Sequence, residues 1–300
     1  MEANPPTNFF STTESRVTPV TFQQFHAALS FYSDDAVRLR VVSNYDKRSD
    51  DAVLEIAAVE TLKTFAHCHE AVCRHKDNQS VMFTLLVQFA QSNDAALRLE
   101  AVQTLESLFH LHKDNQTAAA SAGAVALLVQ FAQSDDAALQ LAAVQALGSL
   151  VRYHEDNQTA AASLGAVELL VQFGKLHNAA LQLAAFQTLG SLVHNHNDNQ
   201  TAAANAHAFE LLMQFGRSGN AALQLEAVIS LGSLVYCHTA NQTAFATADA
   251  VELIMQLSRS DDTKIQNESV CSYLSFFCSN SIHLPDPSLM TTGELRAVFL

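Results

Sequence analysis

The stretch NQTAAASAGAVALLVQFAQSDDAALQLAAVQALGSL, residues 115–150, carries the pattern that decides the fold of this chain. Its opening tripeptide, Asn-Gln-Ser/Thr, begins at Asn78, Asn115, Asn157, Asn199 and Asn241. The last three of these intervals are 42 residues each, and the first is 37. The run LLVQF, which reads LIMQL in its last copy, recurs every 42 residues from Leu85 to Leu253. A fixed period of this length is typical of a protein built from stacked repeats.

Within one unit, the spacing of apolar residues predicts three helices. Asn115 is a good N-cap residue, and a short helix of small side chains follows it. Residues 124–133 predict a second helix with an apolar stripe, and the polar turn 134–136 caps a third. The third helix repeats apolar residues that we expect to be buried, among them Leu141, Val144 and Leu147. Since one unit cannot bury these stripes by itself, neighbouring units must stack.

The copy that begins at Asn78 departs from this pattern. Its segment SVMFTLLVQF is five residues shorter than the matching segment of the other copies. The difference predicts a first helix that has lost more than one turn. A compensating insertion of six residues precedes it, within residues 66–76.

A short helix followed by two longer ones, at a period of 42, falls in the range of armadillo and HEAT repeats. The stretch 115–150 resembles an armadillo repeat, in which an N-x-x-x-x-x-x-x-G-A start precedes a leucine-rich pair of helices. The resemblance covers about residues 47–279. It implies an all-α fold, a right-handed α-solenoid of three-helix repeats. We expect this array to span residues 21–278 with degenerate terminal repeats, between polar tails at 1–20 and 279–300.

Composition narrows the classes of protein to which the chain can belong. Hydrophobic residues make up 49% of the chain and charged residues 15%, which suits a folded protein with a large core. Acidic residues outnumber basic ones by 30 to 16, and the basic residues are not clustered, which disfavours nucleic-acid binding. Five unpatterned cysteines suit a reducing compartment. No signal peptide or membrane-spanning stretch is visible, so we expect a cytoplasmic protein without membrane insertion.

In armadillo proteins the third helices line a concave groove that binds extended peptides. Importin-α carries Trp and Asn four residues apart on these helices, and Gln145 and Ser149 occupy the corresponding positions here. The resemblance therefore implies peptide binding without the Trp/Asn ladder, which argues against a nuclear-transport adaptor. The positions equivalent to Gln145 and Ser149 recur in every repeat, and residues one helical turn before or after them lie on the same side of the helix. Together they give one predicted groove: Glu100, Gln103, Ser107, His110, Gln145, Ser149, Arg152, Gln187, Ser191, His194, Ser233 and Tyr236.

Histidines form a second repeated column, at His69, His112, His154, His196 and His238. We interpret them as structural residues that bond carbonyls at the end of each third helix, because no Cys or carboxylate recurs beside them as a metal ligand. We likewise interpret each Asn of the sequons as a helix cap rather than a glycosylated residue. No phosphate-binding loop, nucleophile motif or zinc-protease motif is present.

These observations predict a non-enzymatic protein–protein interaction scaffold without a cofactor, which binds a partner protein or an extended peptide in the groove. The polar tails and the closely similar copies suggest the further hypothesis of a bacterial effector acting in a host cell. Two alternatives remain open at this point. One is a nuclear-transport-type adaptor, and the other is a metal-binding regulator that uses the His- and Cys-rich insertion at 66–76.

Overall fold

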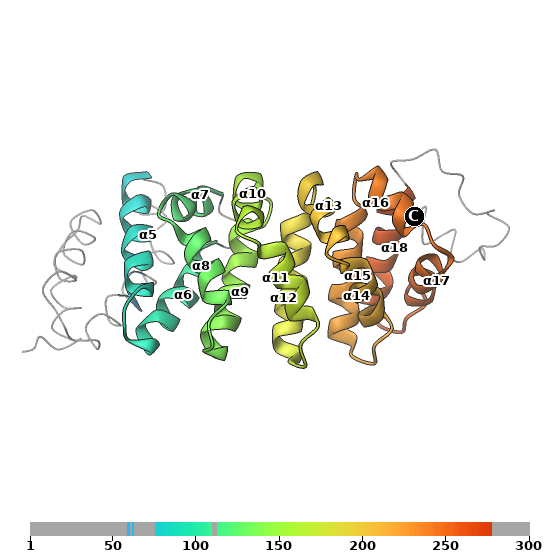
Figure 1. The fold of residues 1–300 in the computed structure, drawn as a ribbon, viewed down its shortest axis with the longest axis horizontal. Coiled ribbons are helices and arrows are strands. Elements are labelled where there is room, and N and C mark those ends of the chain that lie inside the picture. Colours follow the sequence, from blue (N-terminus) through green and yellow to red (C-terminus); the bar gives the residue numbers. More distant parts are fainter. Residues whose placement is uncertain (1–58, 61, 63–75, 110–112, 278–300) are drawn as a thin grey trace, which may run out of the picture. The chain divides into compact units, whose positions relative to one another are not determined.

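A computed structural model describes residues 59–60, 62, 76–109 and 113–277, and every regular element in these ranges is an α-helix (Figure 1). The all-α prediction is confirmed. The chain divides into two compact units, residues 1–108 and 109–300, which we describe separately. The two predicted tails, residues 21–58 of the predicted array, and His69, His110 and His112 lie outside the described residues. So does the insertion, except for Lys76.

Unit 1 contains α5 (Lys76–Ala90) and α6 (Ala95–Phe109). The sequence predicted a separate, shortened first helix, and this is wrong. α5 is a single helix that continues without a break through the LLVQF run. The physical reason is the missing turn. In a complete copy, a left-handed residue such as Gly123, with a φ of 92°, separates the first helix from the second. Without this residue the two helices join into one.

In unit 2 the described residues form four layers of three helices each. The first layer contains α7 (Lys113–Ser121), α8 (Ala124–Ala132) and α9 (Ala137–Val151). The second contains α10 (Glu155–Ser163), α11 (Ala166–Gly174) and α12 (Ala179–Val193). The third contains α13 (Asn197–Asn205), α14 (Ala208–Gly216) and α15 (Ala221–Val235). The fourth contains α16 (Thr239–Phe245), α17 (Ala248–Leu257) and α18 (Thr263–Phe277).

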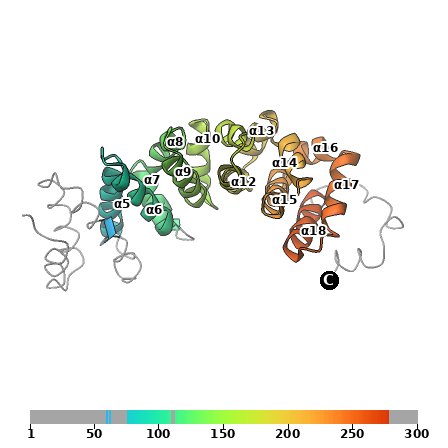
Figure 2. The ribbon, with the colours of Figure 1, turned by 90° about the horizontal axis from the view of Figure 1, so that it is seen from below.

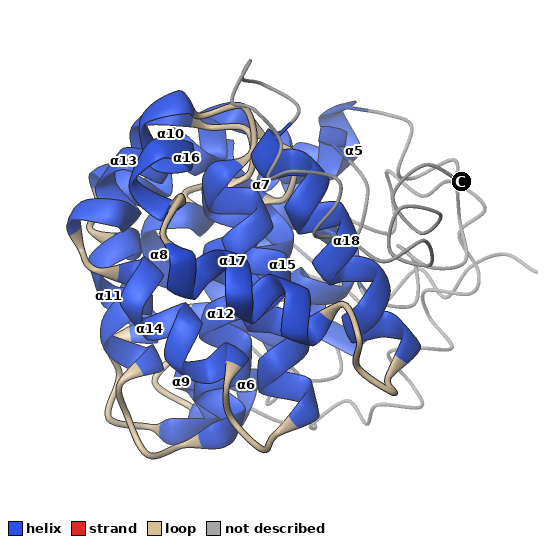
Figure 3. Cartoon of the chain, turned by 90° about the vertical axis from the view of Figure 1, so that its right-hand side faces the viewer, coloured by secondary structure: helices blue, strands red, loops and turns tan. Residues whose placement is uncertain are grey.

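The third helices of unit 2 form a continuous row. α9 packs against α12, α12 against α15, and α15 against α18, and Figure 2 shows them following one another along one side of the unit. Each second helix packs on the third helix of its own layer. Seen along the stack, α10, α13 and α16 gather at one edge (Figure 3). This stacking buries the apolar stripes, as the repeat predicts.

The core bears out most of the predicted burial. Val144 and Leu147 of α9 are buried, as are Leu189 of α12 and Leu231 of α15. The predicted burial of Leu141 is wrong, because its side chain remains partly exposed. It lies one turn before Gln145, so it shares the exposed side of α9 rather than the buried one.

The caps of the third helices follow the prediction, with Asp136 accepting hydrogen bonds from the backbone N–H groups of Ala138 and Leu139. The caps of the first helices do not. Asn157 was predicted to cap α10, but the helix begins two residues earlier and its N-cap residue is His154. His196 and His238 cap α13 and α16 in the same way. These three histidines are therefore structural, as interpreted, but they cap the following helix instead of the preceding one.

Candidate partner-binding face

The polar side chains predicted to line a groove lie on the row of third helices. α9 and α12 each carry three of them, counting the C-cap residue, at steps of four and three residues, and α15 carries two, three residues apart. Such steps place the side chains on one side of each helix. Because these helices pack side by side, the columns of neighbouring layers lie next to each other. We call this set the third-helix face; it consists of Gln145, Ser149, Arg152, Gln187, Ser191, His194, Glu226, Ser233 and Tyr236. Each of these side chains is partly or fully exposed.

Buried glutamines anchor the end of the face in the first three layers of unit 2. The side-chain amide of Gln116 donates to the carbonyl oxygens of Ser149 and Arg152, at 2.8 and 3.1 Å. Gln158 and Gln200 make the equivalent pairs of bonds in the next two layers. These bonds satisfy carbonyls at the C-terminal end of the third helix, which would otherwise need another partner. The backbone of the face is therefore held in place, while its side chains remain accessible.

Buried asparagines join one layer to the next. The Asn157 amide donates to the Leu150 carbonyl at 2.9 Å and to the Gln116 carbonyl at 3.4 Å. Asn199 and Asn241 repeat both bonds one and two layers further on. A buried amide that already donates twice cannot also carry a glycan, so these sequons serve the fold. These asparagines are structural, as predicted, but their side chains bond to carbonyls of the preceding layer instead of capping the first helices.

An aromatic row runs along the C-terminal edge of the face. The His194 ring lies edge-on to Tyr153, with centroids 5.4 Å apart, and stacks on Tyr236 at 5.3 Å. The Arg152 guanidinium lies 5.6 Å from the centre of the Tyr153 ring. Burial lowers the pKa of His194, and the nearby positive charge of Arg152 lowers it further. His194 is therefore held towards its neutral form, in which it can both donate and accept a hydrogen bond.

Glu226 is the acidic member of the face. Burial raises the pKa of its carboxyl group, and the neighbouring Glu268 raises it further, whereas the Gln187 hydrogen bond and the charge of Arg152 oppose the shift. Gln187 donates to Glu226 Oε1 at 3.0 Å across the layer boundary. The predicted groove includes Glu100 of the same column but omits Glu226, and the two layers between them hold Ala142 and Ala184 at this position.

In unit 1, α6 carries three of the predicted residues. Gln103 is exposed, whereas Glu100 and Ser107 are partly buried. The Ser107 hydroxyl donates to the Thr104 carbonyl at 2.8 Å. The three residues lie at steps of three and four, so they share a side of α6 as the predicted residues of unit 2 share theirs.

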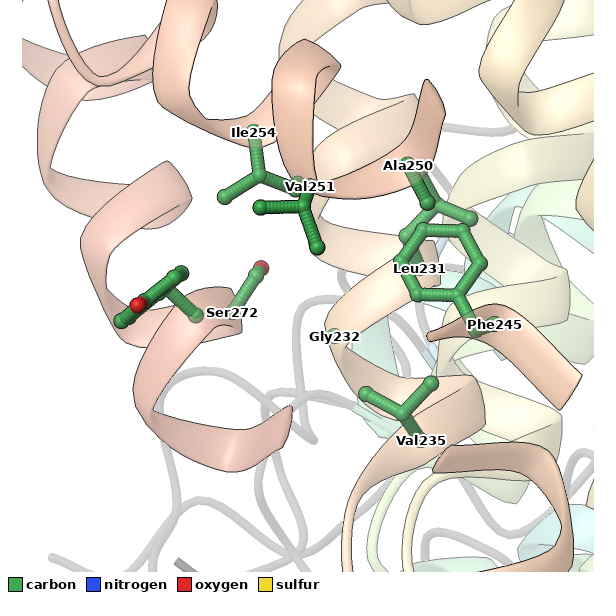
Figure 4. Close-up of a pocket in the computed structure, with 9 residues that line it drawn as sticks. Leu231, Gly232, Val235, Phe245, Ala250, Val251, Ile254 and Ser272 are labelled. Atoms are coloured by element: carbon green, nitrogen blue, oxygen red, sulfur yellow. The ribbon is translucent and has the colours of Figure 1, made fainter. Parts of the chain in front are cut away.

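A small apolar hollow lies elsewhere in unit 2, between the last two layers (Figure 4). It has a cavity volume of only about 10 Å³ and is lined by α15, α16, α17 and α18. Val251 contributes to its wall at a position where the preceding layer has Phe209, whose ring stacks on Phe245 at 5.1 Å. The smaller side chain leaves this space unfilled.

The described part of the chain holds no cluster of three or more His, Cys, Asp or Glu side chains arranged to bind a metal ion. Among the helices described, none combines the length and the apolar character needed to cross a membrane.

Solved structures with the same arrangement of helices are repeat proteins. An engineered protein matches with a TM-score of 0.70 and 21% identity, over 82% of this chain and 98% of its own. A designed armadillo repeat protein in complex with the peptide (KR)4 matches with a TM-score of 0.69 and 14% identity, over 79% and 98% of the two chains. No protein-family model and no curated protein matches the sequence. The chain thus has an armadillo-like repeat fold.

Proposed function

We propose that this protein is a non-enzymatic scaffold that binds an extended peptide segment of a partner protein along the third-helix face. The observation that carries the proposal is the register of this face. The same polar positions recur on helices that pack side by side, and buried glutamines hold the backbone beneath them. An array of exposed polar groups on a rigid support is where repeat proteins bind.

The chemistry of the face suits a peptide main chain. Gln145 has an amide that is both a donor and an acceptor, and the Ser149 hydroxyl has the same dual character. The Ser191 hydroxyl donates to the Gln187 carbonyl at 3.0 Å and keeps its oxygen as an acceptor. Packed helix axes lie about 8–10 Å apart, and an extended chain advances about 3.3 Å per residue. Each layer therefore spans two to three residues of a bound strand, and the row from α9 to α18 spans roughly ten.

The side chains of the face add selectivity. Arg152 supplies a cation, Glu226 a partly buried carboxylate, and Tyr236 an aromatic surface that is 39% exposed. Aromatic residues and arginines are the side chains that most often dominate binding energy at interfaces. The designed protein is in complex with the peptide (KR)4, and at 14% identity its peptide preference does not carry over to this chain.

Selection from a random peptide library on the full-length chain tests the proposal. The triple variant Ser149→Trp, Arg152→Glu, Ser191→Trp should bind the selected peptides at least tenfold more weakly, because it fills the face and reverses its charge. A matched control changes exposed second-helix positions, as Glu168→Lys and Gln172→Trp, and should bind as the wild type does. Equal affinity of the first variant and the wild type would place the binding site elsewhere.

A further inference from the structure

Three histidines occupy equivalent junctions between the layers of unit 2, and in each of them both ring nitrogens have a partner. Nδ1 of His154 lies 3.4 Å from the backbone nitrogen of Asn157, and its Nε2 lies 2.9 Å from the Thr117 hydroxyl of the preceding layer. His196 repeats the two contacts at 3.4 and 2.8 Å. His238 repeats them at 3.1 and 3.0 Å. Each ring therefore caps one helix and bridges to the helix stacked beside it.

The hydrogen bonds assign the tautomer of these rings. The Thr117 hydroxyl donates its proton to the Lys113 carbonyl at 2.9 Å, so its oxygen accepts from Nε2–H of His154. Thr201 donates to the Asn197 carbonyl at 3.0 Å and accepts from His238 in the same manner. Nδ1 is then unprotonated, and its lone pair accepts the backbone N–H. Only the neutral ring makes both bonds.

A second proton on the ring removes this arrangement. Protonated Nδ1 becomes a donor and faces the N–H group of the helix that it capped. The added positive charge also lies at a helix N-terminus, where the helix dipole disfavours cations. The cap is lost, and the first turn of the helix loses an acceptor that it needs.

We propose that His154, His196 and His238 form an acid-sensitive latch between layers, which holds the stack while the rings are neutral and loosens it when they are protonated. The proposal concerns the cohesion of the stack and does not depend on the binding partner. The latch also lies two residues beyond Arg152, His194 and Tyr236, so its opening would disturb the edge of the third-helix face.

Charged groups on the surrounding helices differ from junction to junction. Around His154 they are Lys113 and Asp114 of α7, and Glu155 and Asp156 of α10. Around His196 they are Glu155 and Asp156 of α10, and Asp198 of α13. Near His238 the charged group is Asp198 of α13, and the charged residue of α15, Glu226, lies about three turns away along that helix.

At the first junction, burial lowers the pKa of His154 and Lys113 lowers it further, while Asp156 and the backbone oppose the shift. Because the folded pKa lies below that of the unfolded chain, the unfolded state binds the proton more readily. The contribution of His154 to stability is thus fully present above about pH 6.5 and is lost as the pH falls from there through the lower folded value.

Urea unfolding of the full chain between pH 7.5 and 5.5 tests the latch. The triple variant His154→Asn, His196→Asn, His238→Asn keeps a capping side chain but cannot titrate. The wild type should lose stability on acidification and take up more protons on unfolding than this variant. A control variant, His177→Asn, changes an exposed loop histidine and should behave as the wild type does. Equal pH dependence of the wild type and the triple variant overturns the proposal.

Nitrogen NMR of the wild type provides a second readout that is independent of any variant. At pH 7.5 the three rings should be neutral with the proton on Nε2. On acidification, the amides of Asn157, Asn199 and Asn241 should lose protection from hydrogen exchange together, before the protein unfolds globally. Rings with the proton on Nδ1, or amides that remain protected to pH 5.5, would contradict the latch.

Discussion

A Cβ atom placed on Gly148 would lie 2.6 Å from the Thr188 hydroxyl oxygen, too close for any real contact. That hydroxyl donates to the Val144 carbonyl of the preceding third helix at 2.8 Å. The same pairing recurs between Gly190 and Ser230. Glycine at these positions lets one third helix approach the next closely enough for the buried hydroxyl to find an acceptor. This close approach sets the distance between neighbouring third helices, and with it the spacing of side chains along the third-helix face.

The first prediction follows from this close approach. Gly148→Ala should lower the free energy of unfolding by about 1–3 kcal/mol, because the added methyl group forces the helices apart or breaks the Thr188 bond. Chemical denaturation measures the change. Gly219→Ala is the matched control, since nothing lies within 4 Å of its added Cβ and its φ is ordinary; it should change stability by less than about 1 kcal/mol.

A double-mutant cycle sharpens this test. In a Thr188→Ala background the clashing oxygen is absent, so Gly148→Ala should cost less than it does in the wild type. Strictly additive effects would show that the two residues do not interact.

The second prediction concerns the turn between layers. Cys237 is exposed and has a φ of 53°, a left-handed conformation that strains most residues but not glycine. Cys237→Gly should therefore raise the free energy of unfolding, by up to about 1 kcal/mol. Cys271 is also exposed but lies within α18, so Cys271→Gly should lower stability by about 1 kcal/mol. If both substitutions destabilised the protein, the strain at Cys237 would be negligible.

The third prediction uses the raised pKa of Glu226. A folded-state pKa above the unfolded value of 4.5 means that the folded chain binds this proton more tightly. Stability linked to Glu226 is then present below pH 4.5 and is lost as the pH rises through the folded pKa. Glu226→Gln removes this loss, so the variant should be slightly more stable than the wild type at pH 7, by less than about 1 kcal/mol for a partly exposed group. The advantage should vanish at pH 4.

Thermal unfolding at the two pH values checks this prediction. The matched control Glu252→Gln changes an exposed carboxylate of α17 and should show no comparable dependence. A larger advantage of Glu226→Gln at pH 4 than at pH 7 would reverse the expected sign.

The repeat period and the apolar spacing were enough to predict the fold of unit 2. The second and third helices were placed to within a few residues, because the helical period and the turn at Asp136 are both visible in the sequence. The first helix was misplaced. Asn157 and His154 are both plausible cap residues, and only the stacked structure shows that the asparagine amide is needed by carbonyls 7 and 41 residues away.

The candidate site was predictable only in outline. Helical spacing was sufficient to place Gln145, Ser149 and Arg152 on one side of α9. It could not show that Gln187 reaches Glu226 of the next layer, since that contact depends on how the layers pack. The fused helix α5 was also missed, because a deletion reveals that residues are lost but not whether the remaining backbone bends or continues.

The last prediction tests the aromatic edge of the third-helix face. Tyr236 is partly exposed and stacks on His194, so its ring is held in place before any partner arrives, which reduces the entropic cost of binding. Tyr236→Ala should weaken binding of a library-selected peptide by about 2 kcal/mol, which corresponds to roughly thirtyfold in affinity. Its effect on stability should be smaller, because the tyrosine backbone, not its ring, accepts the Gln200 bond. Leu164→Ala removes an equally accessible hydrophobic side chain from the turn after α10 and serves as the control. Titration calorimetry of both variants decides the matter: a loss confined to Tyr236→Ala supports binding on the third-helix face, whereas an equal loss, or none, rules out the aromatic edge as an anchor.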